Sequence, residues 1–339
     1  MDNIHTTGVA FAGSLQKVLH GSEGFWLWLT YLGDPGTVFL LYFPLAYALQ
    51  KRLAVTVLWL GLICEWLNLV LKWFLFGERP FWWVHESGLV DGYKLRQFPS
   101  TCETGPGSPS GHCMITGAAL LPIMMFLTSK LQSGIQRHVP LLMYILLMSG
   151  IGISRLLILA HFPHQVLAGI LSGVLLGYIL KRSVPYNRSF VFYIMASMIL
   201  LFGALLVYWG MSAFGADLSW SIHLATKWCS KPEWVRPESR PFSSVTRSAG
   251  NAMGLGFALC CPLYQKLHRS YPGWRVRGTI LLLSIFFLKI QQSLPLPVFS
   301  PFLYYTLNFL RHCLCPLIVI IFTPYLVTGL YSVRQPKKE

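Results

Sequence analysis

Nine stretches of the chain are long and apolar enough to cross a bilayer, and this feature limits the possible folds more than any other. They cover about 26–50, 54–76, 111–129, 139–159, 163–180, 190–210, 249–265, 278–295 and 302–330. A membrane-spanning helix needs about 20 mostly apolar residues. Within lipid every backbone polar group must be bonded inside the segment, so such runs predict helices. We therefore predict an all-α, polytopic membrane protein with about nine transmembrane helices.

The composition excludes a soluble or a disordered chain. Hydrophobic residues make up 54% of the sequence and charged residues 12%, whereas a soluble domain carries about 25% charged residues and a disordered chain is poor in apolar ones. No internal repeat or soluble module is visible, which indicates one integral membrane domain over residues 1–339. The net charge of +15 is scattered in pairs between apolar runs, which argues against a nucleic-acid partner.

The basic residues predict which way the chain faces. Loops on one side hold bases opposed only by Glu339, namely Lys51, Arg52, Lys130, Arg137, Lys181, Arg182, Arg188, Lys266, Arg269, Arg275, Arg277, Arg334, Lys337 and Lys338. Short loops rich in Lys and Arg lie on the cytosolic side of a membrane. With an odd number of spans, the C-terminus is then cytosolic and the N-terminus is not. Two longer loops, about 77–110 and 211–248, are expected on the non-cytosolic side.

Cysteines and aromatic residues add two smaller expectations. Cys102 and Cys229 are the only cysteines in polar loops, and no zinc-type spacing occurs. We do not expect a disulfide between these two. Aromatic clusters near span ends, such as Phe81-Trp82-Trp83, predict a belt at the membrane interface.

Three polar motifs fall at the same side of the membrane. The chain leaves the second span with Lys72 and Arg79, enters the third at Ser110-Gly111-His112, leaves the fourth at Arg155 and enters the fifth at His161 and His164. An exit from an even span and an entry to the next odd span share one face. We therefore expect these motifs, distant in sequence, to meet at the non-cytosolic face.

Taken together, the motifs indicate a phosphate site. Each alone has a structural explanation: Lys72 can extend its charge from a helix end, Ser110 can cap a helix, and a histidine at a helix start is usually structural. Jointly they supply cations, and the Gly/Pro-rich run from Gly105 leads into a helix N-terminus that favours an anion. Two histidines beside such a site suit a nucleophile and an acid.

The order and spacing of Lys72-x6-Arg79-Pro80, Pro109-Ser-Gly-His112 and Ser154-Arg155-x5-His161 resemble the three-part signature of the type 2 phosphatidic acid phosphatase and vanadium haloperoxidase superfamily. Stretches such as Phe-Gly-Glu-Arg-Pro-Phe-Trp-Trp-Val, Cys102-Glu-Thr-Gly-Pro-Gly-Ser-Pro-Ser-Gly-His and Ala160-His-Phe-Pro-His-Gln are similar to the glucose-6-phosphatase catalytic subunits, and most of all to their broadly expressed third branch. The likeness covers nearly the whole chain. It implies a type 2 phosphatidic acid phosphatase-like helical core.

The resemblance also implies a mechanism. His161 would attack phosphorus and form a phosphohistidine, and His112 would act as general acid and then general base. The phosphate would be bound by Lys72, Arg79, Ser110, the Gly111 N–H and Arg155. No acidic ligand set for a metal lies near these motifs, so we expect neither metal nor cofactor.

The implied substrate is glucose 6-phosphate or a close relative such as 1,5-anhydroglucitol 6-phosphate. It would be hydrolysed at the lumenal face of the endoplasmic reticulum membrane, where the active site and the N-terminus would lie. A lumenal site needs a carrier for its substrate, which in this family is the glucose-6-phosphate transporter. The other expected partner is membrane lipid.

One position departs from the superfamily, whose third motif commonly has Asp four residues after the nucleophile. This chain has Gln165 there, so another group is expected to orient His161. Asp34 is the best candidate, although it also suits a turn beside Pro35; if it is structural, Gln165 or a backbone carbonyl takes the role. For His164, orienting the pocket and structural packing are equally compatible with the sequence.

One ion pair and two alternative functions remain open at the level of sequence. Glu65 is spaced by seven from Lys72 and suits an ion pair with it. A lipid phosphate or polyprenyl diphosphate phosphatase would carry the same three motifs. A non-catalytic transporter or scaffold would show polar residues within spans, as Glu65, Lys289 and Arg311 are here.

Overall fold

A computed structural model describes residues 2–89, 95–132, 134–235, 241–268 and 273–334, and these residues are helical with connecting loops and no strand. The elements are α1 (Asp2–Val18), α2 (Glu23–Leu32), α3 (Pro35–Thr37), a π-helical turn (Val38–Tyr42), α4 (Phe43–Leu49), α5 (Lys51–Leu75), α6 (Pro80–Glu86), α7 (Gly111–Lys130), a 3₁₀ turn (Gln136–His138), α8 (Val139–Leu157), α9 (Pro163–Leu180), α10 (Phe190–Ala213), α11 (Trp220–Trp228), a 3₁₀ turn (Pro232–Trp234), α12 (Pro241–Cys260), α13 (Pro262–His268), α14 (Trp274–Ser293), α15 (Pro301–Leu317), a second π-helical turn (Ile318–Phe322) and α16 (Thr323–Arg334). The all-α, multi-pass class predicted from sequence is confirmed.

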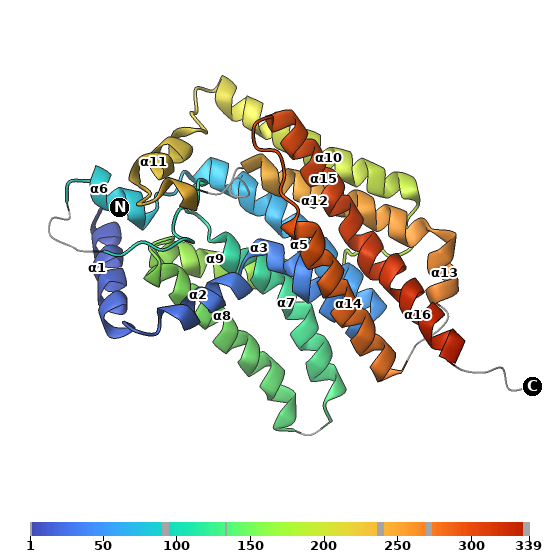
Figure 1. The fold of residues 1–339 in the computed structure, drawn as a ribbon. Helices are drawn as coiled ribbons and strands as arrows, with labels where there is room; N and C mark the ends of the chain where they lie inside the picture. Colours follow the sequence, from blue (N-terminus) through green and yellow to red (C-terminus); the bar gives the residue numbers. More distant parts are fainter. Residues whose placement is uncertain (1, 90–94, 133, 236–240, 269–272, 335–339) are drawn as a thin grey trace, which may run out of the picture.

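The predicted count of nine spans is not confirmed. Among the described residues, 6 helices are long and apolar enough to cross a membrane. The number is 7 if α2 and the helical segment Pro35–Leu49 count as one span with a bend of 55° between them. Two other expected spans correspond to α12 and α14, each of 20 residues and therefore about 30 Å long. Polar residues such as Arg247 and Lys289 lower the mean hydropathy of these two helices, so their composition, and not their length, sets them apart from the six. The ends of the described chain lie at opposite ends of the bundle (Figure 1).

Helix α5 lies at the centre of the bundle and packs against α7, α12, α4 and α10. Helix α9 approaches α7 closely because glycines line the contact. A Cβ atom on Gly169 would lie 2.6 Å from the Ser110 carbonyl oxygen, and one on Gly173 would lie 2.6 Å from that of Met114. Small residues four apart allow such close packing of helices within membranes. The N-terminal ends of α7 and α9 are thereby held side by side.

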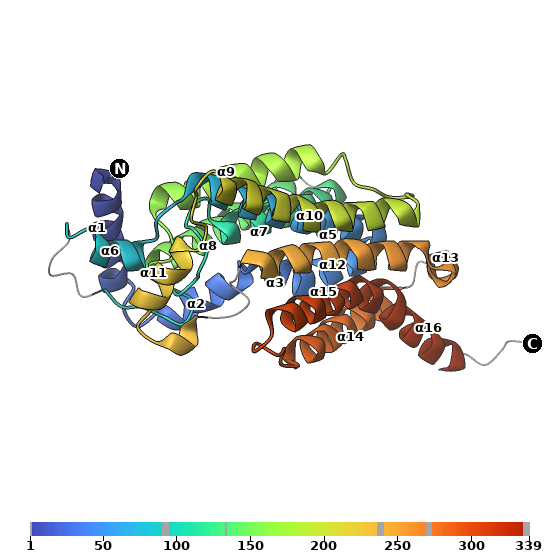
Figure 2. The same ribbon diagram turned by 90° about the horizontal axis from the view of Figure 1, so that it is seen from above.

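Helices α1, α6 and α11 form a cap at one end of the bundle, which both ribbon views show (Figures 1 and 2). Phe81, Trp82 and Trp83 are buried in this cap together with Val9 and Phe162. The prediction of an interfacial belt was therefore wrong for these aromatic residues, because α6 turns back onto the bundle and is covered by α1 and α11.

A disulfide joins Cys102 to Cys229, with Cα atoms 5.7 Å apart. The expectation that they are unpaired was wrong. The two predicted loops, 77–110 and 211–248, fold against each other rather than separately, and Gln97 Nε2 donates to the Trp228 carbonyl at 2.8 Å. Residues 90–94 and 236–240 of these loops lie outside the described residues. The second loop is also shorter than expected, because α12 already begins at Pro241.

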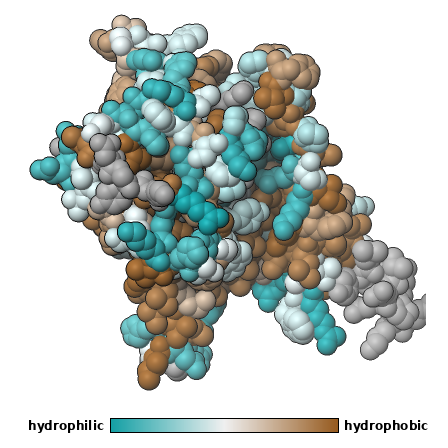
Figure 3. Space-filling view, turned by 60° about the vertical axis from the view of Figure 1, so that its left-hand side comes forward, coloured by the Kyte–Doolittle hydropathy of each residue, from teal (hydrophilic) through white to brown (hydrophobic). Residues whose placement is uncertain are grey.

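The outer faces of several helices are apolar. Leu142, Ile145 and Leu146 on α8 and Phe202 and Leu206 on α10 are exposed. Figure 3 shows apolar side chains concentrated where the hairpin of α7 and α8 protrudes at the lower end of the view, and hydrophilic ones over the cap. A continuous exposed apolar surface is typical of a lipid-facing bundle.

The expected ion pair between Glu65 and Lys72 is absent from the structure. The Glu65 carboxylate instead accepts from Arg247 Nε at 2.9 Å and from the Ser248 hydroxyl at 2.8 Å, both on α12. Glu65 is 2% exposed. The buried charge is thus compensated from the second half of the chain, and Lys72 stays available to the polar site at the end of α5.

Candidate active site

The three polar motifs meet at the cap end of the bundle, as the alternation of spans predicted. The Gly107 N–H donates to the Gly77 carbonyl at 2.6 Å, and the Ser110 N–H donates to the Gln165 carbonyl at 3.0 Å. These two bonds join the end of α5 to the loop before α7, and that loop to the start of α9. A Cβ atom on Gly77 would lie 2.6 Å from the Ser108 backbone nitrogen, so the segments approach this closely only because a glycine is present.

Arg79 is buried and held from three sides. Its Nε atom donates to the Gly105 carbonyl at 2.7 Å and its Nη1 atom to the Ala160 carbonyl at 3.0 Å. Its Nη2 atom lies 2.9 Å from the Glu103 carboxylate. Arg79 comes after the end of α5 at Leu75 and caps the start of α6. Its position is therefore fixed by loop carbonyls, which leaves its charge at the centre of the site.

Arg155, near the end of α8, shares the Glu103 carboxylate with Arg79 and is fully buried. Its Nη2 atom bonds Glu103, but within the described part of the chain its Nε and Nη1 atoms have no hydrogen-bond partner. Unpaired buried donors of a guanidinium are rare because each costs about 1–3 kcal/mol or more. The Nε and Nη1 atoms of Arg155 are therefore suited to bind an anion.

Glu103 was not predicted as a site residue, although it lies in the run from Cys102 to His112 that carries the second motif. Its carboxylate contacts Arg79 and Arg155 and lies 3.7 Å from His112 Nδ1. Burial raises the pKa of Glu103, but the charges of Arg155 and Arg79 outweigh this and hold that pKa well below its usual range. Glu103 is therefore ionised at neutral pH, and it partly neutralises the cationic cluster.

His161 lies in the short loop between α8 and α9 and is 1% exposed. Its Nδ1 atom is 2.8 Å from the Gly107 carbonyl oxygen, and its Nε2 atom has no partner within the described residues. A carbonyl can only accept, so Nδ1 carries the proton and Nε2 presents a lone pair. Burial, and then the charges of Arg79 and Arg155, hold the pKa of His161 well below its usual range. The imidazole is thus neutral and unprotonated at the atom that faces the site.

The three residues expected to orient His161 have other contacts. Gln165 donates from Nε2 to the Glu78 carbonyl at 2.7 Å and accepts from the Phe162 N–H at 3.0 Å, so its amide holds the backbone around the nucleophile position. The ring of His164 stacks on Phe162 at a centroid distance of 5.8 Å. His164 also stacks on His5 of α1 at 5.6 Å, which is a packing contact with the cap.

Asp34 faces the other histidine of the site. One of its carboxylate oxygens accepts from the Gly36 N–H at 2.7 Å at the start of α3, and the other lies 3.9 Å from His112 Nε2. The turn role considered for this residue is therefore present, together with a contact to His112 that the sequence did not suggest. The Gly107 carbonyl occupies the orienting position at His161.

The remaining predicted phosphate ligands line the same space. Lys72, in the last turn of α5, extends toward Gly105, whose added Cβ atom would be 4.0 Å from Nζ. Ser110 is buried at the N-cap of α7, and Gly111 is the first residue of that helix. The Asn68 amide donates to the Pro109 carbonyl at 3.1 Å and thereby fixes the loop that leads into this helix end.

Comparison with known proteins gives a consistent relationship. The PAP2 superfamily matches residues 52–189, the segment that carries all three motifs. Glucose-6-phosphatase 3 of Bos taurus is 48% identical over 333 residues, 96% of each chain, and that of Homo sapiens is 47% identical over the same shares. Glucose-6-phosphatase catalytic subunit 1 of Haplochromis nubilus is 35% identical over 354 residues, 100% of each chain. No solved structure shows significant similarity.

Proposed function

Since the chain belongs to the glucose-6-phosphatase family, within the PAP2 superfamily, we propose that it is a phosphatase that hydrolyses glucose 6-phosphate or a closely related sugar phosphate. The observation that supports this most directly is a buried pair of arginines, of which Arg155 has Nε and Nη1 atoms without a partner, beside an imidazole nitrogen with a free lone pair. Phosphoryl transfer depends mainly on positioned positive charge around the transferred group. The site supplies this charge from its own side chains.

In the first step, the phosphate of the substrate lies among Arg79, Arg155 and the N-terminus of α7, where the helix dipole and N–H groups favour an anion. His161 Nε2 attacks phosphorus, so that an N–P bond forms while the bond from phosphorus to the sugar oxygen breaks. His112 gives its proton to the leaving oxygen. The products are the free sugar and a phosphohistidine.

In the second step, water replaces the sugar. His112, now neutral, removes a proton from the water, whose oxygen bonds to phosphorus while the N–P bond breaks. Inorganic phosphate leaves, and His112 is again protonated. The Gly107 carbonyl stabilises the positive charge that develops on His161 through the Nδ1–H hydrogen bond of 2.8 Å, in the role that a carboxylate has in a catalytic triad.

Asp34 has a role beside His112 in this scheme. At 3.9 Å from Nε2 its carboxylate favours the protonated imidazole that must donate to the sugar oxygen. Glu103, at 3.7 Å from Nδ1, acts on the same ring from the other side. Both acids oppose the repulsion that the neighbouring arginines exert on a protonated His112.

The distribution of bases supports a lumenal site in the endoplasmic reticulum membrane. The end of the bundle opposite the site carries Lys51, Arg52, Lys130, Lys181 and Arg182, and bases gather on the cytosolic side of membrane proteins. The N-terminus and the cap would then be lumenal and the C-terminus cytosolic. A lumenal site also requires delivery of substrate, for which the glucose-6-phosphate transporter is the proposed partner.

The proposal is tested by measuring phosphate release by purified protein from glucose 6-phosphate and from phosphatidic acid in parallel. We expect turnover of the sugar phosphate and little of the lipid, and an acid-labile phosphoenzyme after rapid quenching. The His161→Ala variant should lose both turnover and phosphoenzyme, and His164→Ala serves as a nearby control, because the His164 ring packs against the cap. Preference for the lipid would favour a lipid phosphatase, and turnover by the His161 variant would exclude the mechanism.

A further inference from the structure

A pocket of about 380 Å³ lies at the end of the bundle opposite the active site. It is lined by the start of α5 with Gln50, Arg52, Leu53 and Thr56, by Pro122 and Met125 of α7, and by Lys181, Arg182 and Tyr186 after α9. Thr56 and Lys72 are 16 positions apart on α5, which places the pocket roughly 24 Å from the phosphate site. The pocket is therefore separate from the catalytic residues.

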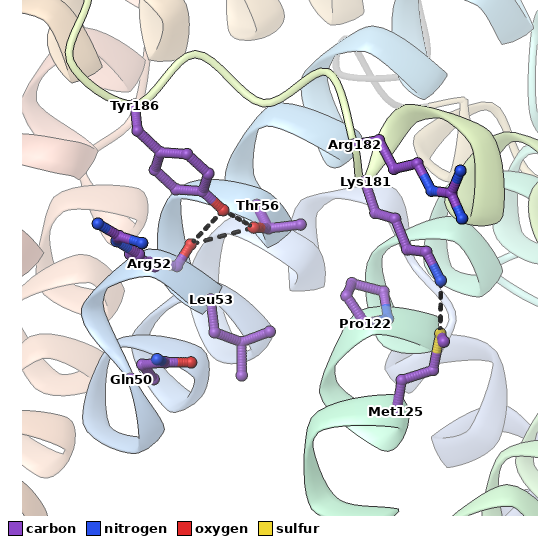
Figure 4. A pocket seen from close by; sticks show the side chains of 9 residues that line it. All are labelled: Gln50, Arg52, Leu53, Thr56, Pro122, Met125, Lys181, Arg182 and Tyr186. Atoms are coloured by element: carbon purple, nitrogen blue, oxygen red, sulfur yellow. Dashed lines mark hydrogen bonds between the residues drawn. The ribbon is translucent and has the colours of Figure 1, made fainter. Parts of the chain in front are cut away.

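Three bases stand around this pocket. Figure 4 shows Arg52 at one edge and Lys181 and Arg182 at the other, with Leu53 and Pro122 between them. Among the described residues, no ion pair involves any of the three. Lys181 Nζ instead lies 4.2 Å from the centre of the Tyr178 ring and 3.3 Å from the Met125 sulfur. Uncompensated cations at the rim of a hollow attract an anion.

Hydrogen bonds hold the frame of the pocket in place. The hydroxyl of Tyr186 donates to the Arg52 carbonyl at 3.1 Å and also contacts the Thr56 hydroxyl. This ties the segment after α9 to the start of α5 and brings Arg52 opposite Lys181 and Arg182. Only Arg52 and Arg182 are exposed among these bases, so the anion would enter from outside the bundle.

The surroundings of the pocket are apolar and membrane-like. Met125, which lines the pocket, is exposed, as are Leu175 and Ile179 on α9, and α5, α7 and α9 are all helices that can span a membrane. A ligand that reaches the pocket from the lipid would meet bases at the level of the helix ends and apolar side chains below them. Basic pockets between helices at a membrane surface bind phosphate head groups of anionic lipids.

We infer that this pocket binds the head-group phosphate of an anionic phospholipid, with Arg52, Lys181 and Arg182 around the phosphate and the acyl chains along α7 and α9. The inference does not depend on the proposed catalytic activity. The sequence predicts lipid only as the medium around the helices. The pocket adds one defined site at which a single lipid binds.

The test is native mass spectrometry of the full-length protein in neutral detergent with phosphatidylinositol, whose phosphodiester a monoesterase does not cleave. Phosphatidylcholine is the neutral lipid control, and glycerophosphoinositol carries the same phosphate without acyl chains. We expect one phosphatidylinositol bound per chain in preference to phosphatidylcholine. The double variant Arg52→Gln/Lys181→Gln should bind roughly 30-fold more weakly, since each base near an anionic lipid contributes roughly fivefold.

The matched control is Lys130→Gln/Arg188→Gln, which removes two bases from the same end of the bundle that do not line the pocket. It should bind phosphatidylinositol like the parent protein. Phosphate release by both double variants reports whether the fold is intact. Equal loss of binding in both variants would mean diffuse attraction by surface charge and would overturn the inference. So would unchanged binding in the pocket variant, or binding of glycerophosphoinositol as tight as that of the lipid.

Discussion

The carboxylate of Glu103 lies between Arg79 and Arg155 and pairs with both. We predict that Glu103→Gln destabilises the empty protein and tightens its binding of phosphate. Gln keeps the size of the side chain and one hydrogen-bond acceptor, but it removes the negative charge. Arg79 and Arg155, both fully buried, would then repel each other without a counter-charge.

The structure sets the size of the effect. Removing one partner of a buried ion pair costs about 3–5 kcal/mol, because a buried charge is left uncompensated. At about 2 °C per kcal/mol for a chain of this size, the midpoint of thermal unfolding should fall by roughly 6–10 °C. A bound phosphate restores the missing charge. If about 1–3 kcal/mol is recovered in this way, phosphate should bind roughly 5- to 150-fold more tightly to the variant than to the parent protein.

The assay is thermal unfolding of purified protein across a phosphate titration. The parent and the variant should differ most without phosphate and converge as phosphate saturates the site. The control is Glu86→Gln, which removes the partner of Lys227 on the exposed cap and should cost at most about 1 kcal/mol. Equal phosphate affinity in parent and Glu103→Gln would refute the assignment of this cluster as the phosphate site.

Three further predictions follow from the site and the topology. Asp34→Asn should lower kcat by at least about tenfold with little change in KM, because the carboxylate beside His112 is needed to favour the donor; near-normal kcat would reduce Asp34 to the cap of α3. The midpoint of the acid limb of kcat/KM should lie below the ordinary histidine pKa of about 6.5, because the lowered pKa of His161 keeps its imidazole neutral as the pH falls. The profile is first corrected for the second ionisation of the sugar phosphate at about pH 6. A midpoint above the ordinary histidine pKa would contradict the protonation state assigned here. The sequon at Asn187, in the exposed loop between α9 and α10, should carry no glycan in cells, and a glycosidase-sensitive band shift lost in Asn187→Gln would invert the proposed orientation.

Much of the site was predictable because membrane topology is discrete. Each apolar run must cross the bilayer and reverse direction, so counting runs places Arg79, His112 and His161 on one side without knowledge of their distances. The conclusion depends on the alternation of spans 2 to 5 alone. It therefore holds even though the total of nine spans is not confirmed by the structure.

The residues that sequence reasoning missed act through loop geometry. Glu103 reaches both arginines, and the Gly107 carbonyl reaches His161, only because the run before α7 folds back over the end of α5. No period or spacing encodes that path. A single acid within a Gly/Pro-rich run between two cationic motifs was the available signal for Glu103. For a backbone carbonyl the side-chain sequence carries no signal.

The cap was missed for a different reason. Helix α1 is too short and too polar to be identified as a span, and its burial depends on contacts with α6 across about 80 residues of sequence. Hydropathy alone identifies segments that face lipid. It does not distinguish an aromatic cluster at a bilayer surface from one buried beneath another helix, as at Trp82.

The pairing of Glu65 with Arg247 sets a condition on biosynthesis. Glu65 enters the membrane with α5, but its partner is made 182 residues later. At about 5–20 residues per second, the ribosome needs roughly 10–40 s to complete that interval. During this time a carboxyl group lies within an inserted helix without its counter-charge, which is costly in lipid. The nascent N-terminal half therefore waits for α12 before its core can close, and a chain truncated before Arg247 would present an unpaired acid to the quality-control machinery of the membrane.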